Sequence, residues 1–103
     1  ADVSGGAQVY GNAKVSGNAK VSGNAKVYKW AIIRDHARAS GNAKVHGHAI
    51  VSGCSSVFEN AKISGYAKVF GYSEVFGNAR VFKNGGVFGR DKVFGRDKVY
   101  KKF

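Results

Sequence analysis

A repeat of six residues runs through the whole chain without a single insertion. It is plainest in residues 15–26, which read VSGNAKVSGNAK. Taking every sixth position from Val3 to Val99 gives 17 sites, of which 14 are Val, two are Ile and one is Ala39. A small residue stands two positions before most of these sites, and Gly stands two positions after most of them. A register kept over so many repeats predicts one continuous architecture for the chain.

The period of six does not fit an α-helix, which needs about 3.6 residues per turn and would be weakened by the recurrent Gly. It fits β-strands, because the small residue and the Val stand two positions apart and therefore point to the same side of an extended segment. Gly and Asn, which follow in many repeats, both tolerate the left-handed backbone region and predict a corner. Each repeat is expected to form a four-residue strand and a two-residue corner.

Two architectures can use such units. A meander of hairpins would consist of very short strands with long exposed edges and a fragile register. A solenoid stacks each strand on an equivalent one and leaves unpaired edges only at its two ends. The unbroken register favours the solenoid, because a shift by one residue would turn every Val outward.

The order of an aliphatic residue, turn-forming residues and a small residue resembles the hexapeptide-repeat family, above all its V-x-G-N-A-K variety in bacterial and phage proteins. The resemblance covers Ala1 to Lys102. It implies an all-β, left-handed triangular parallel β-helix with three repeats per coil and no helix, hence about 5.7 coils of 18 residues. We expect one domain over residues 1–103, which is a processed product or a fragment of a longer protein because it starts with Ala1.

Residues 18 positions apart should lie above one another in such a coil, so columns of side chains follow from the numbering. One corner carries an asparagine in four successive coils. We expect these side chains to form a structural ladder of amide hydrogen bonds: Asn24, Asn42, Asn60 and Asn78.

The outward residue after each Val is mostly Ser in the first half of the chain and aromatic from Phe58 onward. These rings either pack on one another and on Lys stems to shield the strands, or form an apolar surface for a partner. A second copy of the chain, pairing along these C-terminal faces, is the first partner considered, and a glycan is the alternative. The candidate binding residues are the rings and the cations that flank them: Phe58, Phe70, Phe76, Phe82, Phe88, Phe94, Tyr100, Lys68, Arg80, Lys92 and Lys98.

The charge is strongly unbalanced, with 17 Lys and Arg against 6 Asp and Glu and a net charge of +11. Such a field favours polyanionic partners, among them nucleic acid, lipopolysaccharide and anionic membrane surfaces. The same charge also keeps a repetitive β protein soluble and prevents pairing between molecules. Both interpretations stay open on the sequence alone.

The last coil departs from the repeat, because Asp91 and Asp97 occupy the inward site that is otherwise small. A carboxylate inside a closed core would be costly. Only an incomplete coil follows, so each side chain can reach water. We expect the pair to form a polar terminal cap, which solenoids need to prevent end-on growth.

Enzymes of the resembled family, acyltransferases and a zinc-dependent carbonic anhydrase among them, use His residues at subunit interfaces, aided by loops or a helix outside the coil. This chain has no such insertion. Only one of its histidines, His36, falls in the same column as Cys54. Such a pair supplies two ligands where zinc needs three or four, and a nucleophilic Cys would need a base and an orienting group. We therefore expect no catalytic residue, no metal site and no cofactor.

These observations favour a non-catalytic structural module that presents a basic, aromatic surface to a partner, as part of a bacterial surface, phage or toxin protein. A polyanion- or glycan-binding module is the alternative, and an acyltransferase-like enzyme is the third. No apolar run approaches the length of about 18 residues that a membrane span needs. We expect no transmembrane segment and favour a secreted or cell-surface location.

Overall fold

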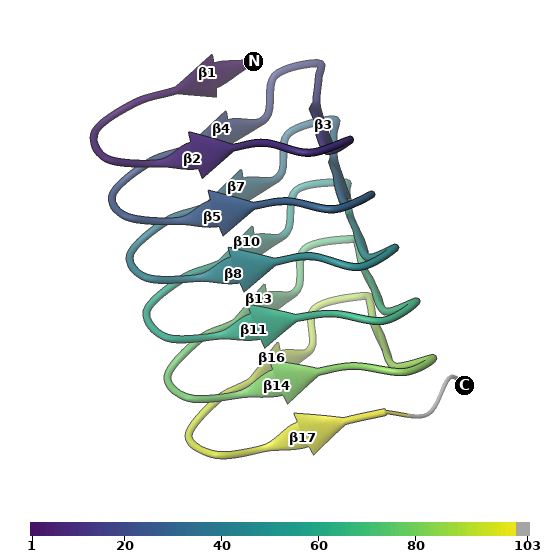
Figure 1. Ribbon diagram of the computed structural model, residues 1–103. Helices are drawn as coiled ribbons and strands as arrows, with labels where there is room; N and C mark the ends of the chain where they lie inside the picture. Colours follow the sequence, from purple (N-terminus) through teal and green to yellow (C-terminus); the bar gives the residue numbers. More distant parts are fainter. Residues whose placement is uncertain (101–103) are drawn as a thin grey trace.

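The chain forms a parallel β-solenoid of about 5 coils with roughly 18 residues in each coil (Figure 1). The computed structural model describes residues 1–100, so the last three residues of the predicted domain lie outside the described part. The 17 strands are two residues long, and residues 1–100 contain no helix. The all-β solenoid expected from the repeat is confirmed.

The strands make three parallel sheets, which are the three faces of the rod. Face A consists of β1 (Asp2–Val3), β4 (Lys20–Val21), β7 (Arg38–Ala39), β10 (Ser56–Val57), β13 (Glu74–Val75) and β16 (Lys92–Val93). Face B consists of β2 (Gln8–Val9), β5 (Lys26–Val27), β8 (Lys44–Val45), β11 (Lys62–Ile63), β14 (Arg80–Val81) and β17 (Lys98–Val99). Face C consists of β3 (Lys14–Val15), β6 (Ile32–Ile33), β9 (Ile50–Val51), β12 (Lys68–Val69) and β15 (Gly86–Val87).

Each strand pairs with the strand of the next coil at a separation of 18 residues. Val27 lies opposite Val45 on face B, for example, and Val57 lies opposite Val75 on face A. Figure 1 shows this order, with β2, β5, β8, β11, β14 and β17 stacked from the N-terminal to the C-terminal end. The stacking sets the positions of the side-chain columns on the surface.

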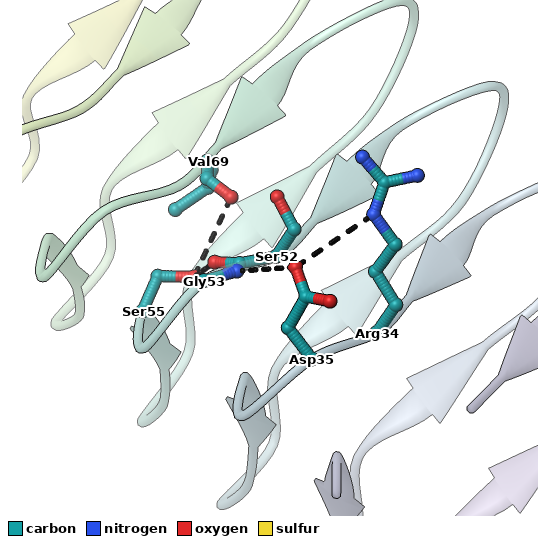
Figure 2. Close-up of polar contacts among 6 residues, drawn as sticks. All are labelled: Arg34, Asp35, Ser52, Gly53, Ser55 and Val69. Atoms are coloured by element: carbon teal, nitrogen blue, oxygen red, sulfur yellow. Dashed lines mark hydrogen bonds and ion pairs between the residues drawn. The ribbon is translucent and has the colours of Figure 1, made fainter. Parts of the chain in front are cut away.

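The core is the column of Val, Ile and Ala side chains that the repeat predicts to point inward. Val45 and Ala43 are fully buried, like nearly all equivalent residues between Ala19 and Val87. Two serines replace Ala at the inward small site, and both hydroxyls are paired. The Ser55 hydroxyl donates to the carbonyl oxygens of Ser52 at 2.7 Å and Val69 at 3.4 Å (Figure 2).

The local geometry differs from the expectation in two respects. The strands are two residues long rather than four, although backbone hydrogen bonds to the next coil continue beyond them, for example from the N–H of Asn24 to the carbonyl oxygen of Gly41 at 2.8 Å. At the corners, only the first residue takes the left-handed backbone conformation, so the Asn that follows Gly does not need it. Four corners hold a non-Gly residue in this conformation: Lys29, Asp35, Glu59 and Lys83.

Candidate functional site

Face B carries an unbroken row of positive side chains. The outward residue directly before each Val or Ile is a cation in five successive strands, and the register stacks these residues one above another. Parallel strands lie about 4.8 Å apart, so the row has that repeat along the rod. We call it the cationic row, and it consists of Lys26, Lys44, Lys62, Arg80 and Lys98.

The two other faces lack such a row. On face A, Asp2 and Glu74 stand in line with the cations, and Glu74 lies opposite Lys92. On face C, Ile32 and Ile50 occupy the equivalent positions of two successive strands. The positive charge is therefore continuous on face B alone among the described residues.

A groove with a volume of about 650 Å³ runs along the cationic row. It lies on the side of the row that faces the preceding corner of each coil. One wall is the Asn column at the corner between faces A and B, and the other wall is the row itself. The lining contains no carboxylate. It consists of Gly6, Gln8, Asn24, Lys26, Asn42, Lys44, Asn60, Lys62, Asn78 and Arg80. Amides and cations together offer hydrogen-bond donors to an anion that lies along the rod.

The asparagines are stacked along one corner, as the numbering predicts. The side-chain hydrogen bonds found within residues 1–100 do not involve these amides. The amide ladder therefore stays a prediction. The four side chains also line the groove, a position that the sequence analysis did not predict.

The predicted stacking of the C-terminal rings is confirmed. Phe76 stacks on Phe58 at 4.9 Å and on Phe94 at 5.5 Å between ring centroids, on face A. Phe70 and Phe88 stack at 5.6 Å on face C. Because each ring covers the next, much of the aromatic surface is used within the column. Phe94 and Phe70 nevertheless remain exposed.

The eleven candidate binding residues do not form one site. They are distributed over all three faces, with Lys92 on face A, Lys68 on face C, and Arg80 and Lys98 on face B. On face B the rings of Phe82 and Tyr100 stack at 5.5 Å beside these last two cations. The structure therefore divides the predicted surface into three separate strips.

Two further groups of stacked rings were missed by sequence reasoning, which considered only the residue directly after each Val, and only from Phe58 onward. Tyr10, Tyr28 and His46 stack on face B, with centroids 5.1 and 4.8 Å apart. The second column follows the corner between faces B and C and consists of Trp30, His48 and Tyr66. Lys26, Lys44 and Lys62 of the cationic row were also missed. The spacing of 18 residues, applied to every outward position, would have found all of them.

The surroundings of the face B column change the proton affinity of two of its members. Burial, together with the nearby charges of Lys29, Lys44 and Lys62, lowers the pKa of His46 below its usual value near 6.5. Burial and the neighbouring Tyr10 raise the pKa of Tyr28. His46 is therefore neutral near pH 7, and its ring packs flat on that of Tyr28.

His36 and Cys54 lie in one column at the corner between faces C and A, as expected. Cys54 is exposed, and no group of three or more potential metal ligands occurs in the described part of the chain. The carboxylate next to His36 is engaged elsewhere, because Asp35 accepts a 3.2 Å hydrogen bond from the backbone of Gly53 (Figure 2). Asp35 also lies 3.9 Å from Arg34.

The carboxylates predicted to cap the C-terminal end, Asp91 and Asp97, are both exposed to solvent. Their exposure agrees with the argument that an inward carboxylate is tolerated only in the last coil. The capping role itself stays a prediction.

Comparison with known proteins finds no matching family model, no matching curated protein and no matching solved structure. Within residues 1–100, no helix is long and apolar enough to cross a membrane.

Proposed function

We propose that this chain is a non-catalytic β-helical module of the hexapeptide-repeat type that binds a linear polyanion along face B. The observation that carries the proposal is the unbroken cationic row. The repeat supports the family and its left-handed coil, and with them a place in a bacterial surface, phage or toxin protein. The other two faces leave room for attachment to further parts of an assembly.

The binding mechanism follows from charge and rigidity. A chain of phosphate, sulfate or carboxylate groups along the rod exchanges its condensed counterions for the row, and the released ions drive association. The backbone of each coil is already held by its neighbours, so little conformational entropy is lost on binding. The Asn side chains in the groove donate further hydrogen bonds to the same groups.

The test compares two triple variants with equal net charge. One replaces Lys44, Lys62 and Arg80 of face B by Gln, and the other replaces three cations of face A, namely Lys20, Arg38 and Lys92. Binding to heparin is measured over a series of salt concentrations. We expect the parent to bind with a steep salt dependence, and the face B variant to bind more weakly and with a smaller logarithmic salt slope, because it makes fewer ionic contacts.

The face A variant should retain most of the affinity of the parent. If the two triple variants lose the same affinity, the binding depends on net charge and the proposed face is wrong. If the parent is not retained on heparin at low salt, the charge serves solubility only. Circular dichroism of each variant verifies that the solenoid is intact.

A further inference from the structure

The ring column of face B has a vacancy in its middle. Tyr10, Tyr28 and His46 stack above it, and Phe82 and Tyr100 stack below it. The position between them belongs to Ser64, whose side chain is too small to contact both neighbours. One ring face of His46 and one of Phe82 are therefore left without a stacking partner from this column.

The vacancy has the size of one planar ring. Rings in this column follow one another at one per coil, with centroids 4.8 to 5.5 Å apart where they are adjacent. The backbone positions of His46 and Phe82 are two coils apart, which is about 9.6 Å at the spacing of parallel strands. A planar group at the level of Ser64 would stack on both at the distances that the column already uses. A cavity of about 320 Å³ opens at this point, lined by His46, Lys62, Ser64, Arg80, Phe82 and Lys98.

The charges around the vacancy suit an anionic group attached to the planar ring. Lys62, Arg80 and Lys98 of the cationic row line the cavity, and no carboxylate does. The Lys83 ammonium does not line the cavity, because it lies beside the stacked rings of Phe82 and Tyr100, 5.9 and 5.8 Å from their centroids. A ring between His46 and Phe82 would have cations along the edge that faces the cationic row.

One other column within residues 1–100 has a non-aromatic residue between two rings, namely His36, Cys54 and Tyr72. It differs in its surroundings, because Asp35 precedes His36 at that corner. The outward residues of the neighbouring strands on face A are Arg38, Ser56 and Glu74, so no continuous row of cations follows it. The combination of a vacant ring position and a cationic row is found at Ser64.

We propose that Ser64 marks a slot for one base of a single-stranded nucleic acid whose phosphates follow the cationic row. This inference rests on the proposed polyanion binding and names the polyanion. Sulfated and carboxylated glycans carry no aromatic rings, whereas every nucleotide joins a planar ring to a phosphate. A duplex keeps its bases paired and stacked inside, so exposing one would cost energy that a single strand does not have to supply.

The slot reads the presence of a base and not its identity. Its walls are ring faces, and every base has a face that stacks on an aromatic side chain. The Ser64 hydroxyl and the cations that line the cavity are placed to meet the phosphate and sugar, which all nucleotides share. We therefore expect affinity to depend weakly on sequence, in line with the absence of a base-reading motif.

The experiment uses a variant that fills the slot. Ser64→Phe completes the ring column, and the fold accommodates Phe at equivalent outward positions such as Phe82. The matched control is Ser40→Phe, which extends the ring column of face A instead. Three fluorescent or competing probes are compared by anisotropy: oligothymidylate of roughly twelve nucleotides, a size within the usual range of single-strand sites, an abasic strand of equal length, and polyphosphate.

We expect the parent and Ser40→Phe to bind oligothymidylate at least about fivefold more tightly than the abasic strand, the effect of one stacked base. Ser64→Phe should bind both strands with the affinity that the parent has for the abasic strand. Its affinity for polyphosphate should equal that of the parent. A parent that binds the two strands equally, or a Ser64→Phe variant that still prefers oligothymidylate, overturns the slot.

The two proposals fail in different ways. Retained polyphosphate binding without any effect of the base overturns the slot and leaves the polyanion-binding face intact. Absence of binding to all three probes at low salt overturns both. If Ser64→Phe does not fold, as judged by circular dichroism, Phe82→Leu removes one wall of the slot and must reduce the preference for oligothymidylate in the same way.

Discussion

Glu59 accepts a 2.8 Å hydrogen bond from the backbone N–H of Gly77, one coil further along the rod. Glu59 is a non-Gly residue with a φ of 59°, at a corner position that is Gly in most repeats. Asp35, with a φ of 61°, makes the equivalent bond to the N–H of Gly53. In both coils an acceptor on the side chain compensates for the left-handed backbone that the side chain disfavours.

Replacing Glu59 by Ala should therefore lower the free energy of unfolding by about 1 kcal/mol, because the hydrogen bond is lost and the backbone strain remains. Replacing it by Gly should cost much less, since the loss of the bond is offset by relief of the strain. Chemical denaturation gives both values. Lys29→Ala is the control, because Lys29 has a φ of 60° and no such carboxylate. An Ala variant at position 59 as stable as the parent would contradict the argument.

Gly85 occupies the inward small site where twelve repeats have Ala. A Cβ atom there would lie 2.5 Å from the carbonyl oxygen of Val99 and 2.9 Å from a methyl group of Val81. We expect Gly85→Ala to destabilise the rod by about 1–3 kcal/mol, as overpacking usually does. Gly86→Ala is the matched control, since nothing lies within 4 Å of a Cβ atom at Gly86.

The control should be neutral or stabilise the rod by about 0.4–1 kcal/mol, because Ala restricts the unfolded chain more than Gly does. Thermal unfolding of the two variants measures the difference between them. Equal melting temperatures would show that the last coil can move away from position 85, and that its contact with Val99 does not constrain the core.

The fold was predictable because its information is local and repeated. Alternation of Ala43 and Val45 determines which side chains point inward, and every later repeat confirms the register. The spacing of 18 residues came from the family resemblance, and with it the columns of Asn24 and Phe58 could be drawn. The crowding at Gly85 was not predictable, because it depends on the position of a backbone atom of Val99 in the next coil.

The candidate site was predictable only in part. The rings after Phe58 attracted attention because they break the Ser pattern, and this led away from Lys44 and Lys62, which follow the ordinary repeat. These lysines are important because no neutral or acidic residue interrupts their row. This becomes clear only when face B is compared with faces A and C. The slot at Ser64 needed the stacking of the rings above and below, which residue types alone do not give.

The aromatic strip on face A leads to a prediction about self-association. Phe94 is 52% exposed at the end of its column, and Ser occupies the equivalent outward position in the early coils. The fold therefore does not need rings there, and apolar contact with a second copy is the expected reason for them. We predict that Phe76→Ser together with Phe94→Ser abolishes self-association and leaves the solenoid folded.

Sedimentation of the parent and of this double variant measures the effect. A parent that is already monomeric excludes self-association through face A. A double variant that loses its β spectrum in circular dichroism would show instead that the rings shield the strands. Tyr10→Ser together with Tyr28→Ser is the control, because it removes two stacked rings from face B.

The lowered pKa of His46 predicts how stability depends on pH. In the unfolded chain this imidazole titrates near its usual value of 6.5, whereas in the rod it takes up a proton only at lower pH. The unfolded state therefore binds more protons in this range, so the contribution of His46 is complete above pH 6.5 and is lost as the pH falls through the folded pKa. Replacing Lys62 by Gln should raise the pKa of His46, which a proton NMR titration of the imidazole measures.

The same group predicts that binding of a polyanion tightens as the pH falls through the range in which folded His46 takes up its proton. An anion along the cationic row neutralises Lys44 and Lys62, whose charges help to keep the His46 imidazole neutral, so binding raises its pKa and takes up a proton. Heparin is a suitable probe, because its sulfates do not titrate in this range. His46→Gln should remove most of this pH dependence while the affinity above pH 7 stays close to that of the parent. A parent whose affinity for heparin is constant between pH 7 and 5, at fixed salt, would show that the anion does not lie next to His46.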